Sequence, residues 1–317
     1  MSQSSEIDPD RLENIEIDSM LDSASDIWVS KHPYWRKRKR NYIVDRLIQK
    51  DSINFIYGKP GAAKSLIAID LVCNLQENGY WANRTTKECI VYYFAYEDPD
   101  GVEDRLTISC IIKRNQKKGE IGTLSFLYDP PDIFDPKTVK AMERQVEDRG
   151  QFGDFVIVID TLNAATPGMN ENDGVEMGKF LDVLRKLRNV GCTIIVVHHT
   201  GKDVQKGMRG HNSHEALADS IFFVEKRQNS NVVKMKRTKD RNGPGGEKFI
   251  FELHTGTIEY DPSEQIPYLE FKDDSDASTS AEKVTEREVK VLNIAEELIE
   301  TDPVNIRSVF GLQTDLL

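Results

Sequence analysis

Short apolar runs that each end at a glycine or a polar residue constrain the fold of this chain more than any other feature. The runs read INFIY, CIVYYFAY, FVIVI and TIIVV, and segments with helical apolar spacing, Leu66–Gln76 and Met177–Arg188, lie between them. Alternating strands and helices form parallel βαβ units, whose ligands bind beyond the carboxyl ends of the strands. We therefore predict that the residues after the four runs meet at one edge of a parallel sheet. These residues are Gly58, Glu97, Asp160 and His198.

The pattern predicts one α/β domain with a tail at each end. Three more strand-like runs, IFFVE, NVVKMKRT and KFIFELH, extend this domain over residues 31–262. Residues 1–30 are acidic and lack periodicity, which favours a disordered arm. FKDDSDASTS is typical of a linker, which we assign to residues 263–280. Residues 281–317 are expected to form a short helical segment, either an isolated docking helix or the start of a winged-helix module.

The net charge of −11 over 317 residues argues against a uniformly basic surface for nucleic acid, although a local basic channel is compatible with it. The basic stretch 31–40, KHPYWRKRKR, has two interpretations. It is either a solvated entry to the domain or a contact with nucleic acid or another subunit.

Cysteine usage and the lack of apolar segments favour a cytoplasmic protein. The four cysteines are scattered without a C-x-x-C pair, so we expect buried, reduced thiols. The N-terminal MSQSSEIDPD lacks the basic and apolar regions of a secretory signal, and no apolar run is long enough to span a bilayer. We expect no membrane partner.

The stretch GKPGAAKS lies between a strand run and a helical pattern, which is the context of a phosphate-binding loop. Backbone N–H groups and the helix N-terminus would point at the phosphates of ATP. Lys64 would reach the β- and γ-phosphates, and Ser65 would help hold Mg²⁺. Ala63 replaces the usual glycine, so the loop keeps its N–H groups but loses easy access to positive φ. A plain turn before a helix is the alternative. The predicted nucleotide-binding residues are Gly58, Lys59, Pro60, Gly61, Ala62, Ala63, Lys64, Ser65 and Leu66.

Acidic residues end two of the other strand runs. Asp160 ends FVIVID and is predicted to hold Mg²⁺ together with Ser65. Glu97 is predicted to activate the attacking water. Its neighbour Asp98 is the rival for this role, and Pro99 makes a simple turn a further alternative.

Two histidines follow the fourth strand run. Strand alternation allows only one of His198 and His199 to face the site. We favour His198 as the residue that contacts the γ-phosphate, and the alternative is a structural capping role for the pair.

Five segments in this order resemble the RepA-type hexameric replicative helicases, which are RecA-like P-loop ATPases of plasmids, phages and mobile elements. They are NYIVDRLIQKDSINFIYGKPGAAKS, VYYFAYEDP, VIVIDTLNAATPGMNENDGVEMGKF, TIIVVHHTGK and MRGHNSHEALADS, within roughly residues 40–260. The resemblance implies a RecA-like α/β core over 31–262, with a mostly parallel sheet flanked by helices and antiparallel strands at its C-terminal side. It also implies a homo-hexameric ring with ATP at each interface and single-stranded DNA in its centre. A replication loader or a primase is a further expected partner.

The resemblance also implies residue roles. Lys64 and Ser65 correspond to the P-loop pair, Glu97 to the catalytic carboxylate, Asp160 to the Walker B acid and His198 to the sensor. Family members usually have glycine at the position of Ala63, so this residue departs from the family pattern and puts full turnover in question.

In RecA-like rings two loops face the DNA, and here they correspond to roughly 163–176 and 200–214. The second loop carries Lys202, Lys206 and Arg209, which suits contacts with a phosphate backbone. An ordinary solvated loop is the alternative. The first loop is acidic and is not predicted to bind DNA.

A ring of this kind also needs an arginine finger that reaches the neighbouring γ-phosphate and accelerates hydrolysis by about 10³–10⁵-fold. In the region where relatives carry a finger, this chain has ALADSIFF without an arginine. Our candidates are Arg241 first and Lys239 second, both in KRTKDRNGP, and Arg209 third.

The leading functional hypothesis is an ATP-driven translocase on single-stranded DNA, a helicase in the replication of a phage, plasmid or mobile element. One alternative is a recombination or regulatory ATPase without unwinding activity. Another is a non-catalytic nucleotide-binding scaffold, which the Ala63 departure keeps open.

Overall fold

The computed structural model describes residues 40–76, 78–114, 124–200, 213–258 and 261–272. The chain divides into two units, Met1–Asn41 and Tyr42–Leu317, and every element below lies in the second unit.

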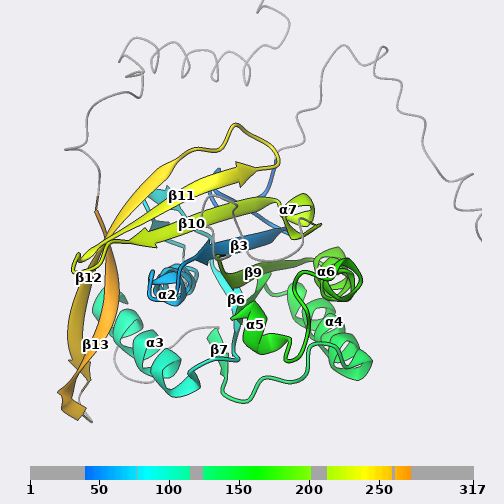
Figure 1. Cartoon of the computed structure of the whole chain (residues 1–317), viewed down its shortest axis with the longest axis horizontal. Helices are drawn as coiled ribbons and strands as arrows, with labels where there is room; N and C mark the ends of the chain where they lie inside the picture. The colour runs from blue at the N-terminus through cyan, green and yellow to red at the C-terminus, as the bar shows by residue number, and fades with distance from the viewer. Residues whose placement is uncertain (1–39, 77, 115–123, 201–212, 259–260, 273–317) are drawn as a thin grey trace, which may run out of the picture. The chain divides into compact units, whose positions relative to one another are not determined.

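Among the described residues, nine strands form one sheet in the order β13-β12-β11-β10-β3-β9-β8-β6-β7 (Figure 1). The strands from β10 to β7 in this order pair in parallel, whereas β10, β11, β12 and β13 pair antiparallel. Their bounds are β3 Ile53–Gly58, β6 Cys89–Ala95, β7 Leu124–Leu127, β8 Asp154–Asp160, β9 Cys192–His199, β10 Ser220–Lys226, β11 Val232–Asp240, β12 Lys248–Ile258 and β13 Asp261–Lys272.

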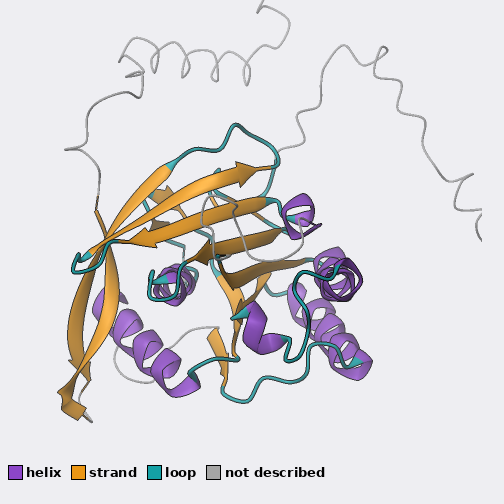
Figure 2. Ribbon diagram, in the orientation of Figure 1, coloured by secondary structure: helices purple, strands orange, loops and turns teal. Residues whose placement is uncertain are grey.

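Helices cover both faces of the parallel part of the sheet (Figure 2). One face carries α2 (Lys64–Asn74) and α3 (Pro99–Arg114), and the other carries α4 (Pro136–Gly150), α5 (Leu162–Ala165), α6 (Gly174–Asn189) and α7 (Ser213–Leu217). Side chains alternate between two cores along β8. Val156 and Val158 pack in the core that contains α2, while Phe155 and Ile157 pack in the core that contains α6. Two covered faces explain why the central strands read as continuous apolar runs.

The predicted fold class is confirmed: the domain is α/β, with a mostly parallel sheet flanked by helices and antiparallel strands at its C-terminal side. The seven strand-like runs all form strands, and the two helical patterns form α2 and α6. The four cysteines are buried thiols outside any disulfide, as expected. Among the described helices, none has the length and apolar character needed to cross a lipid bilayer.

The linker predicted for residues 263–280 is wrong at its start, because β13 continues to Lys272. The last four residues of the strand alternate: Leu269 is buried and Phe271 is partly buried, whereas Glu270 and Lys272 are exposed. Its apolar side chains pack beside α2 and α3, around which β12 and β13 curve in Figure 1. An edge strand with one polar face therefore has the composition of a linker.

Two short hairpins lie side by side, joined by a hydrogen bond from the Asp45 N–H to the Thr85 carbonyl at 2.9 Å. The first consists of β1 (Tyr42–Val44) and β2 (Ile48–Gln49), and the second of β4 (Tyr80–Trp81) and β5 (Arg84–Thr85). Ala82 and Asn83 connect β4 to β5 with φ of 51° and 58°, the conformation of a two-residue type I′ turn. The indole N–H of Trp81 donates to the buried Asp70 carboxylate at 2.8 Å, which ties this hairpin to α2.

Close packing of β3 on β10 leads to a first prediction. A Cβ added to Gly58 would lie 2.2 Å from the carbonyl oxygen of Val224, the residue paired with it on β10. We expect Gly58→Ala to lower the free energy of unfolding by about 1–3 kcal/mol, because the strands must separate. Gly178→Ala, in α6 with no atom within 4 Å, should instead raise it by roughly 0.5–1 kcal/mol. Urea denaturation measures both, and equal stability of Gly58→Ala and wild type would contradict the packing argument.

Candidate nucleotide-binding site

The carboxyl ends of β3, β6, β8 and β9 border a cavity of about 360 Å³. Three of the four elements that we expected to meet contribute predicted residues: the loop after β3, Glu97 after β6 and Asp160 at the end of β8. The predicted loop residues that line the cavity are Pro60, Gly61, Ala63, Lys64, Ser65 and Leu66.

The loop between β3 and α2 has the geometry that its glycines suggest, and Ala63 adopts it as well. Gly61 and Ala63 both have φ of 72°, in the left-handed region. Ala63 is the N-cap of α2, and its carbonyl accepts from the N–H of Ile67 at 3.0 Å. The helix therefore begins at Lys64 with its N-terminus at the cavity, although an alanine in this conformation carries a steric cost.

Lys64 is almost fully buried at the floor of the cavity. Its Nζ donates to the carbonyl oxygen of Lys59 at 3.0 Å and lies 3.3 Å from Nδ1 of His199. Burial lowers the pKa of the Lys64 ammonium, while the nearby carboxylates of Asp160 and Glu97 act in the opposite direction. An anionic phosphate would stabilise the charged form of this lysine.

Asp160 lies opposite the start of α2 and is 1% exposed. Its carboxylate accepts hydrogen bonds from the Ser65 hydroxyl at 3.1 Å and from the Tyr93 hydroxyl at 2.6 Å. Burial raises the pKa of this carboxyl, and the two hydrogen bonds act against that effect. Carboxylate and hydroxyl oxygens at the end of a phosphate-binding loop are donors that suit Mg²⁺, so Ser65 and Asp160 fit the predicted metal role.

Glu97 and Asp98 differ in what holds them. The Thr161 hydroxyl donates to the Glu97 carboxylate at 3.0 Å, and the Glu97 N–H donates to the Asp160 carbonyl at 3.3 Å. Asp98 instead accepts from the N–H of Gly101 in the first turn of α3 and forms an ion pair with Arg105. The Asp98 carboxylate is therefore held by contacts with α3, which favours Glu97 over Asp98 as the catalytic carboxylate.

The prediction that His198 faces the site is wrong, because His199 lines the cavity and contacts Lys64. His198 is fully buried on the opposite face of β9, with its ring 5.8 Å from that of His214. Alternation does select one histidine, as expected. Both faces of β9 are buried and apolar, however, so the run TIIVV does not show whether the odd-numbered or the even-numbered residues face α2.

Besides His199, six cavity residues were not predicted: Val102, Arg105, Thr161, Lys226, Leu253 and Pro267. The sequence positions of two of these residues could have identified them. Lys226 ends β10 just as His199 ends β9, and Arg105 lies two helical turns into α3, on the face of Asp98 and Val102. Nothing in the sequence identifies Leu253 and Pro267, because they reach the cavity only through the curvature of β12 and β13.

The other predicted site residues lie away from this cavity or outside the described residues. Arg241 forms an ion pair with Asp219 at 2.9 Å, and Lys239 donates to the carbonyl of Glu215 in α7. Lys202, Lys206 and Arg209 lie outside the described residues, as do the arm 1–30 and the segment 281–317.

Two acidic residues of the first predicted loop, 163–176, cap a helix or are buried. Asp173 caps α6 by accepting from the N–H groups of Val175 and Glu176, and Glu171 is 4% exposed.

The left-handed conformation of Ala63 generates a second prediction. Ala63→Gly should raise the free energy of unfolding by up to about 1 kcal/mol, because glycine adopts this conformation without the Cβ clash. Ala62→Gly is the matched control: Ala62 is buried and lies outside the left-handed region, so glycine there should cost about 0.4–1 kcal/mol through unfolded-state entropy. Thermal denaturation without nucleotide compares the two, and a loss of stability in Ala63→Gly would refute the strain argument.

Comparison with known proteins places the chain in a family. The family model described as an AAA domain matches residues 21–205. No curated protein matches the chain. Among solved structures, the RadB recombinase is similar at 14% identity with a TM-score of 0.45, over 64% of this chain and 87% of that chain. Because the AAA domain match spans more than half of the sequence, this protein belongs to the AAA domain family of P-loop ATPases.

Proposed function

We propose that this protein hydrolyses ATP and uses the energy to move along single-stranded DNA, as the helicase of a phage, plasmid or mobile element. One observation supports the hydrolysis: a single cavity combines a phosphate-binding loop, a buried lysine, the Ser65–Asp160 pair and a positioned glutamate. Support for the DNA-linked activity comes from the resemblance of five segments to the RepA-type helicases.

In this proposal the loop and Lys64 hold the triphosphate. The N–H groups at the start of α2 and the Lys64 ammonium are fixed before the substrate arrives, so little reorganisation accompanies binding. Ser65 and Asp160 would hold Mg²⁺, which when bound neutralises charge on the phosphate oxygens.

Glu97 is the proposed general base. The Thr161 hydroxyl fixes its carboxylate at the edge of the cavity, where it can accept the proton of a water that attacks the γ-phosphate. His199 takes the sensor role first assigned to His198, because it contacts Lys64 and directly precedes the predicted loop 200–214. A change at the phosphate would in this way reach the proposed DNA-binding residues Lys202, Lys206 and Arg209.

Arg241 and Lys239 remain the proposed finger residues of a homo-hexameric ring. Both side chains bond to the segment 215–219 of their own chain, so a contact with a neighbouring subunit would replace these bonds. Arg209 is the third candidate. A loader or a primase is the proposed protein partner of the ring.

ATP hydrolysis measured with and without single-stranded DNA tests the proposed function. Strong stimulation together with displacement of an annealed strand supports a helicase. Stimulation without displacement supports a recombination or regulatory ATPase instead. Nucleotide binding without turnover, in both the wild type and Ala63→Gly, indicates a scaffold.

The different environments of Glu97 and Asp98 generate a third prediction. Glu97→Gln should lower the rate of ATP hydrolysis by about 10²–10⁴-fold, because the amide cannot accept the proton. Binding of a fluorescent ATP analogue should persist, since Glu97 is assigned no part in holding the phosphates. Asp98→Asn is the control and should keep most of the activity. A reversed pattern would make Asp98 the base.

A further inference from the structure

A second cavity is bordered by β12 and β13, at other residues of these strands than those that line the nucleotide cavity. This cavity of about 400 Å³ lies between the β1–β2 turn, the β4–β5 hairpin and the ends of β12 and β13. We call it the basic groove and define it by six of its lining residues: Arg46, Tyr80, Arg84, Lys248, Phe249 and Lys272.

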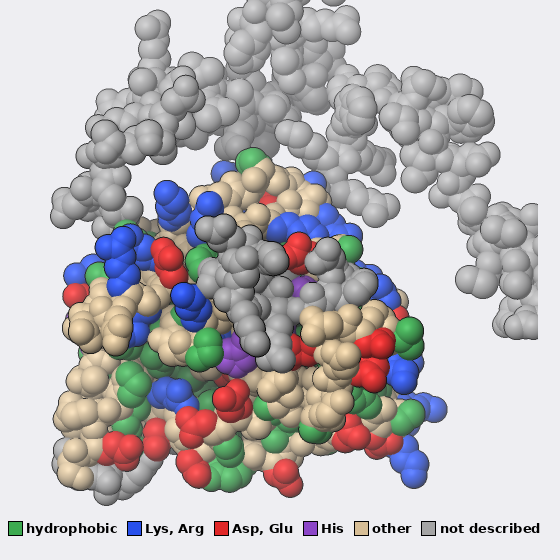
Figure 3. All heavy atoms as spheres, in the orientation of Figure 1, with side chains coloured by type: hydrophobic (Ala, Val, Ile, Leu, Met, Phe, Trp, Pro, Cys, Tyr) green, Lys and Arg blue, Asp and Glu red, His purple; other side chains and the backbone are tan. Residues whose placement is uncertain are grey.

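The groove is cationic although the chain as a whole is strongly acidic. Asp45 is the one carboxylate among its described lining residues, against four cations. The view in Figure 3 shows Lys and Arg side chains, with some Asp and Glu side chains among them, over the region where Figure 1 places β10, β11 and β12, and the four cations of the groove itself outnumber its one carboxylate. A local positive field of this kind attracts a polyanion.

Two lysines beside the groove face each other across neighbouring strands. Lys236 of β11 is directly paired with Lys248 of β12, and both side chains are exposed. Like charges in directly opposed positions destabilise a sheet, because their Cβ atoms lie only about 5 Å apart. Lys272 differs, since it forms an ion pair with Glu252. The Lys236–Lys248 pair therefore costs the fold stability, which an anionic ligand would offset.

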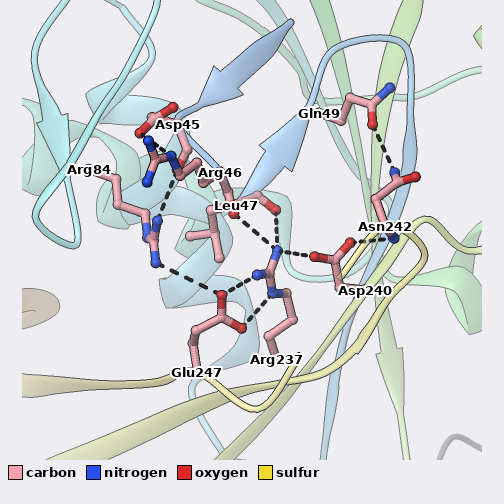
Figure 4. A network of polar contacts seen from close by, with 9 residues as sticks. All are labelled: Asp45, Arg46, Leu47, Gln49, Arg84, Arg237, Asp240, Asn242 and Glu247. Atoms are coloured by element: carbon pink, nitrogen blue, oxygen red, sulfur yellow. Dashed lines mark hydrogen bonds and ion pairs between the residues drawn. The ribbon is translucent and has the colours of Figure 1, made fainter. Parts of the chain in front are cut away.

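A buried arginine holds the walls of the groove in place (Figure 4). Arg237 is 5% exposed and donates to the carbonyl oxygens of Arg46 and Leu47 at 3.2 and 3.5 Å. It also binds Glu247 and lies 3.1 Å from Asp240. This network ties the β1–β2 turn to the loop between β11 and β12.

The same network orients Arg84 at the groove. Its guanidinium donates to the carbonyl of Asp45 at 3.2 Å, lies 3.9 Å from Glu247 and is 5.9 Å from the ring of Phe249. The groove is thus preformed, which lowers the entropic cost of binding.

Tyr80 favours single-stranded nucleic acid over an acidic peptide as the ligand of the groove. Its side chain is 71% exposed on β4, beside the cations of the groove. Exposed aromatic rings beside a cationic groove are the elements of sequence-independent sites for single strands, where bases stack and cations follow the phosphates. An acidic peptide would use the charges but not the ring.

We propose that the basic groove binds the backbone of single-stranded nucleic acid, with a base stacked on Tyr80. This inference rests on the proposed function, because it adds a second contact to a motor that travels on such a strand. None of the lining residues of the groove belongs to the predicted loop 200–214, so variants can test the two sites independently.

Salt dependence of binding to a labelled oligothymidine tests the charges. The binding constant K falls as salt rises, and each phosphate contact with a single strand contributes about −0.7 to the slope of log K against log salt. Lys236→Ala/Lys248→Ala removes two such contacts and should make the slope shallower by about 1.4. The matched control is Lys137→Ala/Lys140→Ala, which removes two exposed lysines of α4 and should leave the slope unchanged. Thermal denaturation should show that the groove variant is at least as stable as wild type.

Substitution of the aromatic residue tests base stacking. Tyr80→Ala should weaken oligothymidine binding about 10-fold or more, whereas Tyr80→Phe should retain it. Tyr128→Ala serves as the control, because Tyr128 is also exposed (49%) but follows β7 at the far edge of the sheet.

The outcomes separate the two proposals. If wild type binds the strand but the groove variants bind with unchanged slope and affinity, the groove inference fails and the motor proposal stands. If wild type binds no strand at any salt concentration, both fail. If Lys236→Ala/Lys248→Ala keeps strand binding but loses polyglutamate binding or lowers the oligomeric mass in sedimentation, the groove is a protein-docking surface and the inference is overturned.

Discussion

The hydrogen bond between Ser65 and Asp160 is the interaction on which the rest of the candidate site depends. It joins the start of α2 to the end of β8, although β9 lies between β8 and β3, the strand that precedes α2. The carbonyl of Asp160 also accepts from the N–H groups of Tyr96 and Glu97, which places the proposed base. One residue at the end of a buried strand thus sets the positions of the phosphate-binding helix, the proposed metal ligands and Glu97.

The parallel core and most of the site could be predicted from sequence because the same physical cause produces both. Strands covered on two faces need continuous apolar runs, and polar residues are accommodated where those runs leave the core. The burial of both strand faces also explains why the orientation of individual side chains could not be predicted. A run such as TIIVV carries no polar face, so only packing against α2 and α6 shows that His199, and not His198, points to Lys64.

The antiparallel side of the sheet was harder to predict, because its side chains owe their positions to contacts between distant segments. β13 has one polar face, so its composition resembles a linker, and its apolar face is recognisable only once α2 and α3 are in place. The basic groove is an extreme case. Arg46, Tyr80 and Lys248 come from three separate regions, and the buried Arg237 that supports the groove lies in a strand rich in lysines.

Strands β12 and β13 border both cavities, since Leu253 and Pro267 line one and Lys248 and Lys272 line the other. Five residues separate Lys248 from Leu253, which is roughly 17 Å along an extended strand. Paired strands are stiff along their length, so a shift of their inner ends when the nucleotide cavity fills must displace their outer ends too. Any movement of these two strands would therefore change the walls of both cavities.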